Sequence, residues 1–253
     1  ICFANAEKMP YLIVGKGSNA LFSDGGFDGL VIINKIDFFE HEPPGFIHVG
    51  AGFSSSLLGT QTAKKGLSGL EFAAGIPASV GGAVFMNAGA QGGETADTLV
   101  AVDFVDRKGV LRHLKREELH FSYRTSSFQS EPEFQRGAIL SAQFKLSCQE
   151  FARKRQIEML NYRIERQPYS NKSCGCIFRN PPGLSAGMLI EKSGLKGFAV
   201  GGAEVSDLHA NFIVNKGGAT AVDVLQLIDA IKKRVYDEHG VLLESEIRII
   251  NEK

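Results

Sequence analysis

The sequence predicts an α+β fold, and three observations support this prediction. The first 146 residues contain short apolar runs that are separated by turn signals, with only brief helical stretches. These runs do not alternate regularly with helices, as the strands of a parallel α/β sheet do. From Gln149 onward, apolar residues recur with the period of an amphipathic helix. We therefore expect a strand-rich first part and a more helical second part.

Each strand is predicted from an apolar run of strand length between turn residues. These runs lie at residues 11–14, 30–33, 46–49, 98–105, 110–114, 138–146 and 247–250. The turn Asp106-Arg107-Lys108-Gly109 predicts a hairpin. The predicted helices cover residues 54–65, 149–167 and 220–240. Thr220 and Asp223 match a capping box at the start of the last helix, and Gly240 ends it.

The helix predicted at residues 149–167 has two faces of different chemistry. Its apolar residues are Phe151, Ile157, Leu160 and Ile164. Its basic residues are Arg153, Lys154, Arg155, Arg163 and Arg166. The simplest interpretation of the basic residues is a solvated face, and a phosphate contact from one of them is the less favoured alternative.

The composition restricts the class of protein. With 253 residues, of which 43% are hydrophobic, the chain can bury one large core or two modest ones. Lys+Arg and Asp+Glu both number 28, so charge favours neither nucleic acid nor an anionic membrane surface as a partner. No apolar run reaches membrane-spanning length, and no signal peptide opens the given sequence. Four cysteines without a secretory context indicate reduced thiols, and we expect a cytoplasmic protein, or a plastid stromal one if the source is a plant.

Residues 75–89 form an apolar stretch that is crowded with small residues and has no charged side chain. Glycine costs about 1 kcal/mol relative to alanine inside a helix, so we do not expect an ordinary core helix here. Small residues let main-chain N–H groups approach an anion closely. The stretch therefore favours a cradle for the pyrophosphate of a large nucleotide cofactor, and a tightly packed turn without a ligand is the alternative.

A second glycine-rich segment, Gly15-Lys16-Gly17-Ser18-Asn19-Ala20, follows the first predicted strand. It loosely matches the dinucleotide fingerprint G-x-G-x-x-A, which requires a helix directly after it. Instead a turn signal at residues 23–26 and a further apolar run at residues 30–33 follow. The sequence therefore predicts a strand, an anion-binding loop and another strand, and not a Rossmann unit.

Three further places carry reactive or charged side chains. Arg124 could clamp a carboxylate or phosphate through two hydrogen bonds, or could be a surface arginine at a strand end. Cys174 and Cys176 lack the further ligands of a structural zinc site, which leaves either one reactive thiol or two inert ones. Strand alternation places Glu246 and Arg248 on one face and Ile247 and Ile249 on the other, so the charged pair faces water or lines a pocket.

Several motifs, taken in chain order, resemble those of the UDP-N-acetylenolpyruvoylglucosamine reductase family. They are Gly15-x-Gly-Ser-Asn, Gly75-Ile-Pro-x-Ser-Val-Gly-Gly-Ala, Met86-Asn-Ala-Gly, Tyr123-Arg-x-Ser-x-Phe, Cys176-Ile-Phe-Arg-Asn-Pro, Gly201-Gly-Ala-Glu-Val-Ser, His209-Ala-Asn-Phe and Glu246-Ile-Arg-Ile. The sequence has no evident tyrosine-bearing insertion and in this respect resembles the shorter subtype of the family. The resemblance implies noncovalently bound FAD, NADPH as reductant, and reduction of an enolpyruvyl ether to UDP-N-acetylmuramate for peptidoglycan and cell wall synthesis.

The resemblance also implies a domain organisation. We expect a two-part FAD-binding module of the vanillyl-alcohol-oxidase type and an α+β substrate-binding domain. The first FAD-binding part covers residues 1–53, the second covers 54–167 with 241–253, and the substrate-binding domain covers 168–240. Family members carry a further N-terminal segment with a Thr-x-x-x-Gly-Gly pattern, which this sequence lacks. We expect that the given sequence is truncated, since a molecule without that segment would bind FAD less well.

The resemblance assigns roles to individual residues. The catalytic residues it implies are Arg124, Cys176 and Glu246, and the substrate-binding residues are Tyr123, Asn180 and Arg166. The implied cofactor-binding residues are Gly15, Lys16, Gly17, Ser18, Asn19, Gly75, Ile76, Pro77, Ser79, Gly81, Gly82, Asn87, Ala88, Gly89 and Arg248. Arg124 and Glu246 would stabilise the negative charge that develops at the substrate carboxylate. Cys176 stands where the family usually has a serine proton donor, and a thiol with a pKa of about 8.5 is a stronger acid than an alcohol.

The resemblance leaves two alternatives and sets the expected partners. NADPH and the UDP-sugar are expected to share one pocket, with no metal, no nucleic acid and no membrane, in a monomer. One alternative is another FAD-dependent oxidoreductase of the same architecture, such as an oxidase of hydroxy acids or sugar lactones. The other is a flavin-binding relic without catalysis.

Overall fold

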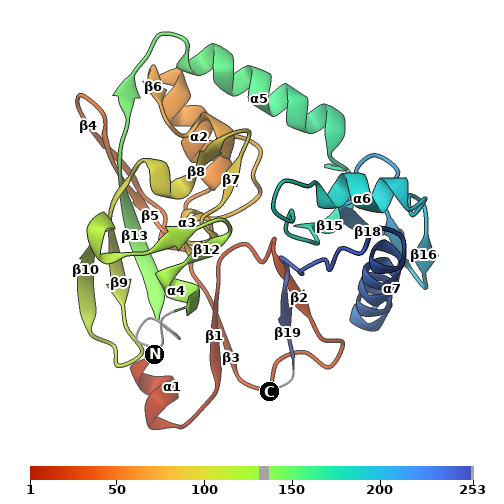
Figure 1. The fold of residues 1–253 in the computed structure, drawn as a ribbon. Helices are drawn as coiled ribbons and strands as arrows, with labels where there is room; N and C mark the ends of the chain where they lie inside the picture. The colour runs from red at the N-terminus through yellow and green to blue at the C-terminus, as the bar shows by residue number, and fades with distance from the viewer. Residues whose placement is uncertain (131–136, 252–253) are drawn as a thin grey trace. The chain divides into compact units, whose positions relative to one another are not determined.

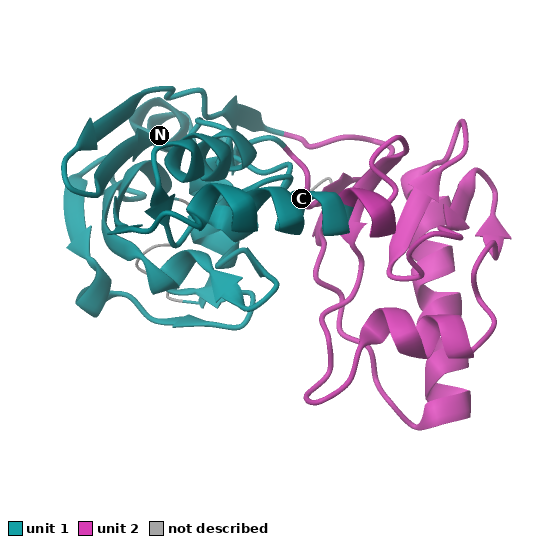
Figure 2. Cartoon of the chain, turned by 90° about the horizontal axis from the view of Figure 1, so that it is seen from above, with its two compact units in different colours: residues 1–16, 29–163 teal, residues 17–28, 164–253 magenta. Residues whose placement is uncertain are grey.

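The computed structural model describes residues 1–130 and 137–251, and the chain divides into two compact units. Unit 1 comprises residues 1–16 and 29–163, and unit 2 comprises residues 17–28 and 164–253 (Figure 2). Figure 1 labels the elements. Among the described residues, no helix is both long and apolar enough to cross a membrane.

Unit 1 is built on a five-stranded antiparallel sheet with the strand order β10-β9-β13-β5-β4. The strands are β4 (Phe39–Glu42), β5 (Phe46–Gly50), β9 (Leu99–Val105), β10 (Leu111–Lys115) and β13 (Ala138–Lys145). The predicted hairpin is confirmed, because the carboxylate of Asp106 accepts hydrogen bonds from the main-chain N–H groups of Lys108 and Val110 at 2.8 and 3.0 Å. The sequence did not predict β4.

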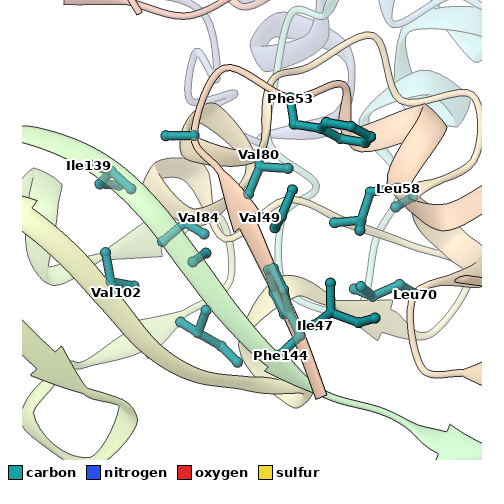
Figure 3. Close-up of a cluster of buried hydrophobic side chains, with 14 of the residues drawn as sticks. Ile47, Val49, Phe53, Leu58, Leu70, Val80, Val84, Val102, Ile139 and Phe144 are labelled. Atoms are coloured by element: carbon teal, nitrogen blue, oxygen red, sulfur yellow. The ribbon is translucent and has the colours of Figure 1, made fainter. Parts of the chain in front are cut away.

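One face of this sheet and two helices enclose the core of unit 1 (Figure 3). Val49, Val102 and Phe144 project from the sheet. Leu58 of α2 (Ser55–Lys64) and Val84 of α3 (Val80–Met86) pack in the same buried cluster. Burying such side chains stabilises the fold by about 1.5–3 kcal/mol each.

The rest of unit 1 consists of short elements. They are α1 (Cys2–Ala6), β1 (Tyr11–Val14), β3 (Leu30–Ile33), β6 (Leu67–Ser68), β7 (Gly89–Ala90), β8 (Gly93–Glu94), β11 (Phe121–Ser122), β12 (Thr125–Ser126), α4 (Ser127–Ser130), β14 (Ser147–Cys148) and 3-10 helices at Glu71–Ala73, Thr95–Asp97 and Arg116–Glu118. β1 pairs with β3 in parallel, and no helix lies between them. The prediction of two strands without an intervening helix is thus confirmed, but the sequence did not predict the short strand at residues 20–22 between them, and anion binding by the loop stays a prediction.

Unit 2 contains a four-stranded antiparallel sheet with the order β15-β18-β17-β16. Its elements are β15 (Lys172–Cys176), α6 (Ala186–Lys192), β16 (Ala199–Val200), β17 (Ala203–Val205), β18 (Phe212–Asn215) and α7 (Ala221–His239). Ile190, Leu227 and Ile231 are in the buried cluster between the helices and the sheet. The chain ends with β19 (Arg248–Ile250), which pairs in parallel with β2 (Ala20–Phe22).

The capping box predicted for α7 is confirmed, and the structure adds a second cap. Thr220 and Asp223 make the reciprocal hydrogen bonds of the box, and Gly240 ends the helix with a φ of +66°. The carboxylate of Asp24 also accepts hydrogen bonds from the N–H groups of Ala221 and Val222, at 2.7 and 3.2 Å. Residues almost 200 positions apart therefore meet at this helix start.

The glycine-rich stretch at residues 75–89 forms a helix that the sequence did not predict. α3 begins after Ser79, whose Oγ accepts a hydrogen bond from the N–H of Gly82 at 3.2 Å. A Cβ on Gly81 would lie 2.9 Å from the Cβ of Ala51. The expectation against a core helix is therefore wrong, because close packing against Ala51 outweighs the intrinsic cost of glycine in a helix.

The helix predicted at residues 149–167 forms as α5 (Ala152–Arg166), but it buries a different face. Phe151 and Ile164, predicted as apolar-face residues, are 50% and 52% exposed. Arg163, predicted on the solvated face, is buried, and its Nη2 donates to the carbonyl oxygen of Phe72 at 3.4 Å. The available core surface, and not the helix's own periodicity, decides which side is buried.

The final strand also departs from the prediction. Ile247 is 5% exposed and Ile249 is 41% exposed, so the two side chains do not share a buried face. The chain bends at Ile247, and the ladder begins only at Arg248. The bend interrupts the alternation on which the prediction rested.

On the other face of the unit 1 sheet, polar side chains form a row across all five strands. His48 lies between Glu40 and Ser141, with Nδ1–Oε2 and Nε2–Oγ distances of 3.1 and 3.0 Å. Ser141 Oγ donates to Asp103, whose other oxygen lies 2.7 Å from Nδ1 of His113. Burial raises the pKa of Asp103, but the bonds from Ser141 and His113 and the nearby histidines outweigh it and hold this pKa below its usual value.

We expect Asp103→Asn to destabilise unit 1 by about 1 kcal/mol at neutral pH, the size of a typical hydrogen bond. A carboxyl group with a lowered folded-state pKa stabilises the fold above its unfolded pKa, and this contribution is lost as the pH falls. The difference between wild type and variant should therefore shrink below about pH 3.9, the ordinary Asp pKa. Urea unfolding at a series of pH values measures it, and a difference that stays constant into acid would contradict the assignment.

Candidate active site

Two of the predicted cofactor-binding segments meet within unit 1. A Cβ added to Gly15 would lie 2.1 Å from Oγ of Ser79, so only glycine allows the loop at residues 15–19 to approach the start of α3 this closely. Lys16 Nζ donates to Ser54 Oγ at 2.9 Å, and Ser54 forms an isolated bridge with Ser79. The structure thus brings Gly15, Lys16 and Ser79 together, as expected for one binding region.

The two segments differ in how their main-chain N–H groups are used. In the glycine-rich stretch, the N–H groups of Val80 and Gly81 donate to the carbonyl oxygens of Phe53 and Ala51 at 2.9 and 2.8 Å. Within the described part of the chain, the N–H groups of residues 16–19 donate no hydrogen bond to another residue. Open N–H groups in succession are what an anion requires. The N–H groups of the loop are thus open, whereas those of Val80 and Gly81 are used in internal packing.

Asn87 ties the glycine-rich stretch to the hairpin that carries Arg124. Its side chain is fully buried, donating to the carbonyl oxygen of Ser122 at 3.0 Å and accepting from the N–H of Ala96 at 3.1 Å. Asn87 itself has a φ of +44°. The side chain of this predicted cofactor residue therefore serves the internal structure, and a cofactor contact through its main chain stays a prediction.

Arg124 lies at the tip of the β11–β12 hairpin. Its φ of +55° is unusual for a non-glycine residue and is typical of functional sites. The guanidinium donates to the carbonyl oxygen of Gly89 at 2.7 Å and lies 5.0 Å from the ring centroid of Tyr123. These contacts orient a positive charge next to the glycine-rich stretch, which suits a carboxylate or phosphate ligand.

In unit 2, Glu246 lies directly beside the strand end that carries Cys176. The N–H of Glu246 donates to the carbonyl oxygen of Ile177 at 2.7 Å, and Ser245 bridges Phe178. The main chain of Glu246 is therefore held next to the residue that follows Cys176. Arg124 belongs to unit 1, so the two halves of the predicted site are described separately.

The two cysteines occupy different environments although only one residue separates them. Gly175 has a φ of +79°, and the pairing register of β15 shifts between Ser173 and Cys176. Cys174 packs against the unit 2 core, and burial raises the pKa of its thiol to about 11. Cys174 is therefore a protonated, unreactive thiol at neutral pH. Among the described residues, no group of three or more His, Cys, Asp or Glu side chains could hold a metal ion.

Asn211 is a supporting residue to which the sequence assigned no role. Its buried side chain accepts from the N–H of Phe178 at 2.9 Å and donates to the carbonyl oxygen of the same residue at 2.8 Å. Asn180, a predicted substrate residue, accepts through Oδ1 from the N–H of Ala186 at 3.0 Å, at the start of α6. The motif His209-Ala-Asn-Phe contains Asn211, but the sequence does not show that Phe178, 33 positions away, is its hydrogen-bond partner.

Two further charged residues of the predicted site have exposed side chains, and a cleft of unit 2 lies among other residues. The side chain of Arg248 is exposed on β19, and that of Arg166 is exposed at the end of α5. The cleft has a volume of about 390 Å³ and is lined by Tyr169, Glu204, Lys216 and their neighbours. No predicted site residue lines this cleft.

The sequence is similar to known protein families and to individual proteins. A family model described as "UDP-N-acetylenolpyruvoylglucosamine reductase, C-terminal domain" matches residues 167–250, and one described as "FAD binding domain" matches residues 1–115. The UDP-N-acetylenolpyruvoylglucosamine reductase of Protochlamydia amoebophila is 56% identical over 250 residues, which cover 99% of this chain and 82% of that protein. The corresponding protein of Chlamydia muridarum is 51% identical over 98% of this chain and 82% of its own length.

A solved structure agrees with these sequence comparisons. The crystal structure of UDP-N-acetylenolpyruvylglucosamine reductase from Thermus caldophilus superposes with a TM-score of 0.81 at 40% identity. The match covers 98% of this chain and 88% of that one. The similarity therefore extends through both units.

The contact between Gly15 and Ser79 generates a prediction about the cofactor. We expect Gly15→Ala to weaken FAD binding by at least about tenfold, because its Cβ forces the loop away from α3, and tenfold corresponds to 1.4 kcal/mol. Titration of the apoprotein with FAD measures this change.

Gly45→Ala is the matched control for this prediction. Its Cβ would lie 2.2 Å from the carbonyl oxygen of Leu146, an equally severe clash in unit 1 away from both cofactor segments. Gly45→Ala should lower the stability of unit 1 and leave the FAD affinity of the folded protein within about threefold, less than 0.7 kcal/mol. Equal losses of affinity in both variants would mean that the contact has no special role in cofactor binding.

Proposed function

The chain belongs to the UDP-N-acetylenolpyruvoylglucosamine reductase family, and we propose how its own residues carry out the family's reaction. The protein is an FAD-dependent oxidoreductase that uses NADPH to reduce UDP-N-acetylglucosamine enolpyruvate to UDP-N-acetylmuramate, a step of peptidoglycan precursor synthesis. The predicted activity, the two cofactors and the α+β class are thereby confirmed.

The loop at residues 15–19 would hold the pyrophosphate of FAD. Its fit to that group is supported by the successive N–H groups of residues 16–19 and by the close approach of Gly15 to Ser79. Gly75, Ile76, Pro77 and the residues of α3 would support this loop, with Ala88 and Gly89 at the following turn. When bound, FAD would accept a hydride from NADPH and, once reduced, transfer it to the enolpyruvyl carbon. We propose Arg248 as a further contact to a phosphate of the nucleotide ligands.

Arg124 and Glu246 would bind the carboxylate of the enolpyruvyl group. The reaction builds negative charge on the carbon next to this carboxylate, and preorganised donors stabilise such charge most effectively. The bonds of Arg124 to Gly89 and its stacking on Tyr123 support this role, because they hold the guanidinium in one orientation. Glu246 would act in its protonated form, so that it donates a hydrogen bond instead of repelling the substrate.

Cys176 would donate the proton that completes the reduction. The observation that carries this proposal is the 2.7 Å hydrogen bond from the N–H of Glu246 to the carbonyl oxygen of Ile177, next to Cys176. It holds the main chain of Glu246 beside the end of β15, next to Cys176, so that both side chains would be near one substrate. The proton would pass from Sγ to the carbon that carries the developing charge.

Tyr123, Asn180 and Arg166 are proposed to bind the substrate, in a pocket that NADPH also uses. The three-part division into residues 1–53, 54–167 with 241–253, and 168–240 also remains a proposal. β19 pairs with β2, a segment of the proposed first FAD-binding part.

The role of Cys176 predicts a difference between the two half-reactions. In Cys176→Ala, reduction of the flavin by NADPH should stay near the wild-type rate, because that step needs no acid at the substrate carbon. Reoxidation by the enolpyruvyl substrate should slow by about 10²–10⁴-fold, as expected when a general acid is lost. Anaerobic stopped-flow absorbance measures each half-reaction separately.

Two further variants control this experiment. Cys176→Ser should retain much of the activity, because its hydroxyl group occupies the same position. Cys174→Ala should change either half-reaction little, since Cys174 packs against the unit 2 core and its thiol stays protonated. If Cys176→Ala slows both half-reactions equally, the residue is structural and the proposed proton donor is wrong.

A further inference from the structure

Asn19 connects the proposed flavin loop to Glu246 within unit 2. Its side-chain Nδ2 donates to the carbonyl oxygen of Glu246 at 3.2 Å. Its own carbonyl oxygen accepts from the N–H of Arg248 at 2.9 Å. One residue of the loop therefore holds the chain on both sides of the bend at Ile247.

Glu246 lies outside the regular strand and depends on such contacts for its position. The ladder between β19 and β2 begins at the pair Arg248 and Ala20, two residues beyond Glu246. On the opposite side, the N–H of Glu246 is held by Ile177. The side-chain amide of Asn19 therefore bonds to Glu246, which lies beyond the end of the ladder.

We propose that Asn19 is a positioning residue that sets the place of Glu246 from the flavin loop. This inference rests on the proposed function of Glu246 and assigns the side-chain amide of Asn19 to the protein, and not to the cofactor. The loop and Glu246 are then expected to move together, because Asn19 makes a side-chain bond to Glu246 and a main-chain bond to Arg248.

A coupling between flavin and Glu246 follows from this connection. A ligand that fixes the loop lowers the mobility of residues 244–250 through Asn19, and by linkage an ordered segment strengthens ligand binding equally. Occupancy of the flavin site would therefore prepare the carboxyl group for the substrate before the substrate binds.

The first test measures order directly and is independent of catalysis. Amide hydrogen exchange over residues 244–250 is compared in the presence and absence of FAD. In the wild type, FAD should slow exchange in this segment, and in Asn19→Ala this protection should fall at least about fivefold at saturating FAD, a change of about 1 kcal/mol, the size of one hydrogen bond.

The matched control for this test is Asn34→Ala. Asn34 also donates from Nδ2 to a distant main-chain carbonyl, that of Ile139 at 2.7 Å, but it lies in unit 1. This variant should keep the full protection of residues 244–250. If Asn19→Ala also keeps it, Asn19 does not position Glu246 and the inference is overturned.

The second test separates positioning from cofactor binding. At saturating FAD, Asn19→Ala should slow reoxidation by the enolpyruvyl substrate about tenfold and change reduction by NADPH less than about threefold, corresponding to 1.4 and under 0.7 kcal/mol. Equal slowing of both half-reactions would overturn the inference. If Glu246→Gln leaves reoxidation at the wild-type rate, the proposed function of Glu246 fails, whereas the exchange experiment still decides whether Asn19 holds the segment.

The isosteric variant Asn19→Asp gives a signature that general damage to the fold would not produce. A carboxylate cannot donate to the carbonyl group of Glu246, but a protonated carboxyl group can. The reoxidation rate of Asn19→Asp, relative to wild type, should therefore rise as the pH is lowered from about 8 to about 5, toward the titration range of a carboxyl group. A ratio that is independent of pH would contradict the proposed bond.

Discussion

The insertion of residues 244–250 between Asn19 and the end of β15 is the constraint on which unit 2 depends. The segment is bonded to Ile177 and Arg179 on one side and to Asn19 and β2 on the other. The chain can meet this requirement only if residues 17–28 leave unit 1 and join the C-terminal part. Unit 2 is discontinuous in sequence for this reason, and Asp24 strengthens the arrangement by capping α7 from the same short segment.

Such a topology has a consequence for folding. The partners in the β2–β19 ladder are separated by 228 positions, as in the pair Ala20 and Arg248. Closing a long loop costs conformational entropy before its contacts are gained, so local elements form more readily than long-range pairs. The capping box and periodic face of α7 make it a local element, whereas the site around Glu246 requires both ends of unit 2. The part of the proposed site that lies in unit 2 is therefore expected to form late in folding.

The sequence predicted those elements whose stability is encoded locally. The strands β1, β3, β5, β9, β10 and β13, and the helices α2 and α7, follow from apolar runs, turn residues and caps within the element itself. It did not predict α3, which depends on the close packing of Gly81 on Ala51. It also did not predict the buried face of α5, where Arg163 is buried and Ile164 is exposed. The same limit holds for the site. Motifs identified Cys176 and Glu246, but the bonds of Asn19 and Asn211 join residues that are far apart in the chain.

The Cys-Gly-Cys sequence illustrates how one backbone feature can give two identical side chains different roles. In a regular strand, Cys174 and Cys176 would lie on the same face and share one environment. The positive φ of Gly175 and the register shift after Ser173 interrupt the strand between them. Cys174 then contributes its volume to the core, and burial keeps its thiol protonated with a pKa of about 11. A neutral thiol at Cys174 adds no charge next to the proposed proton donor.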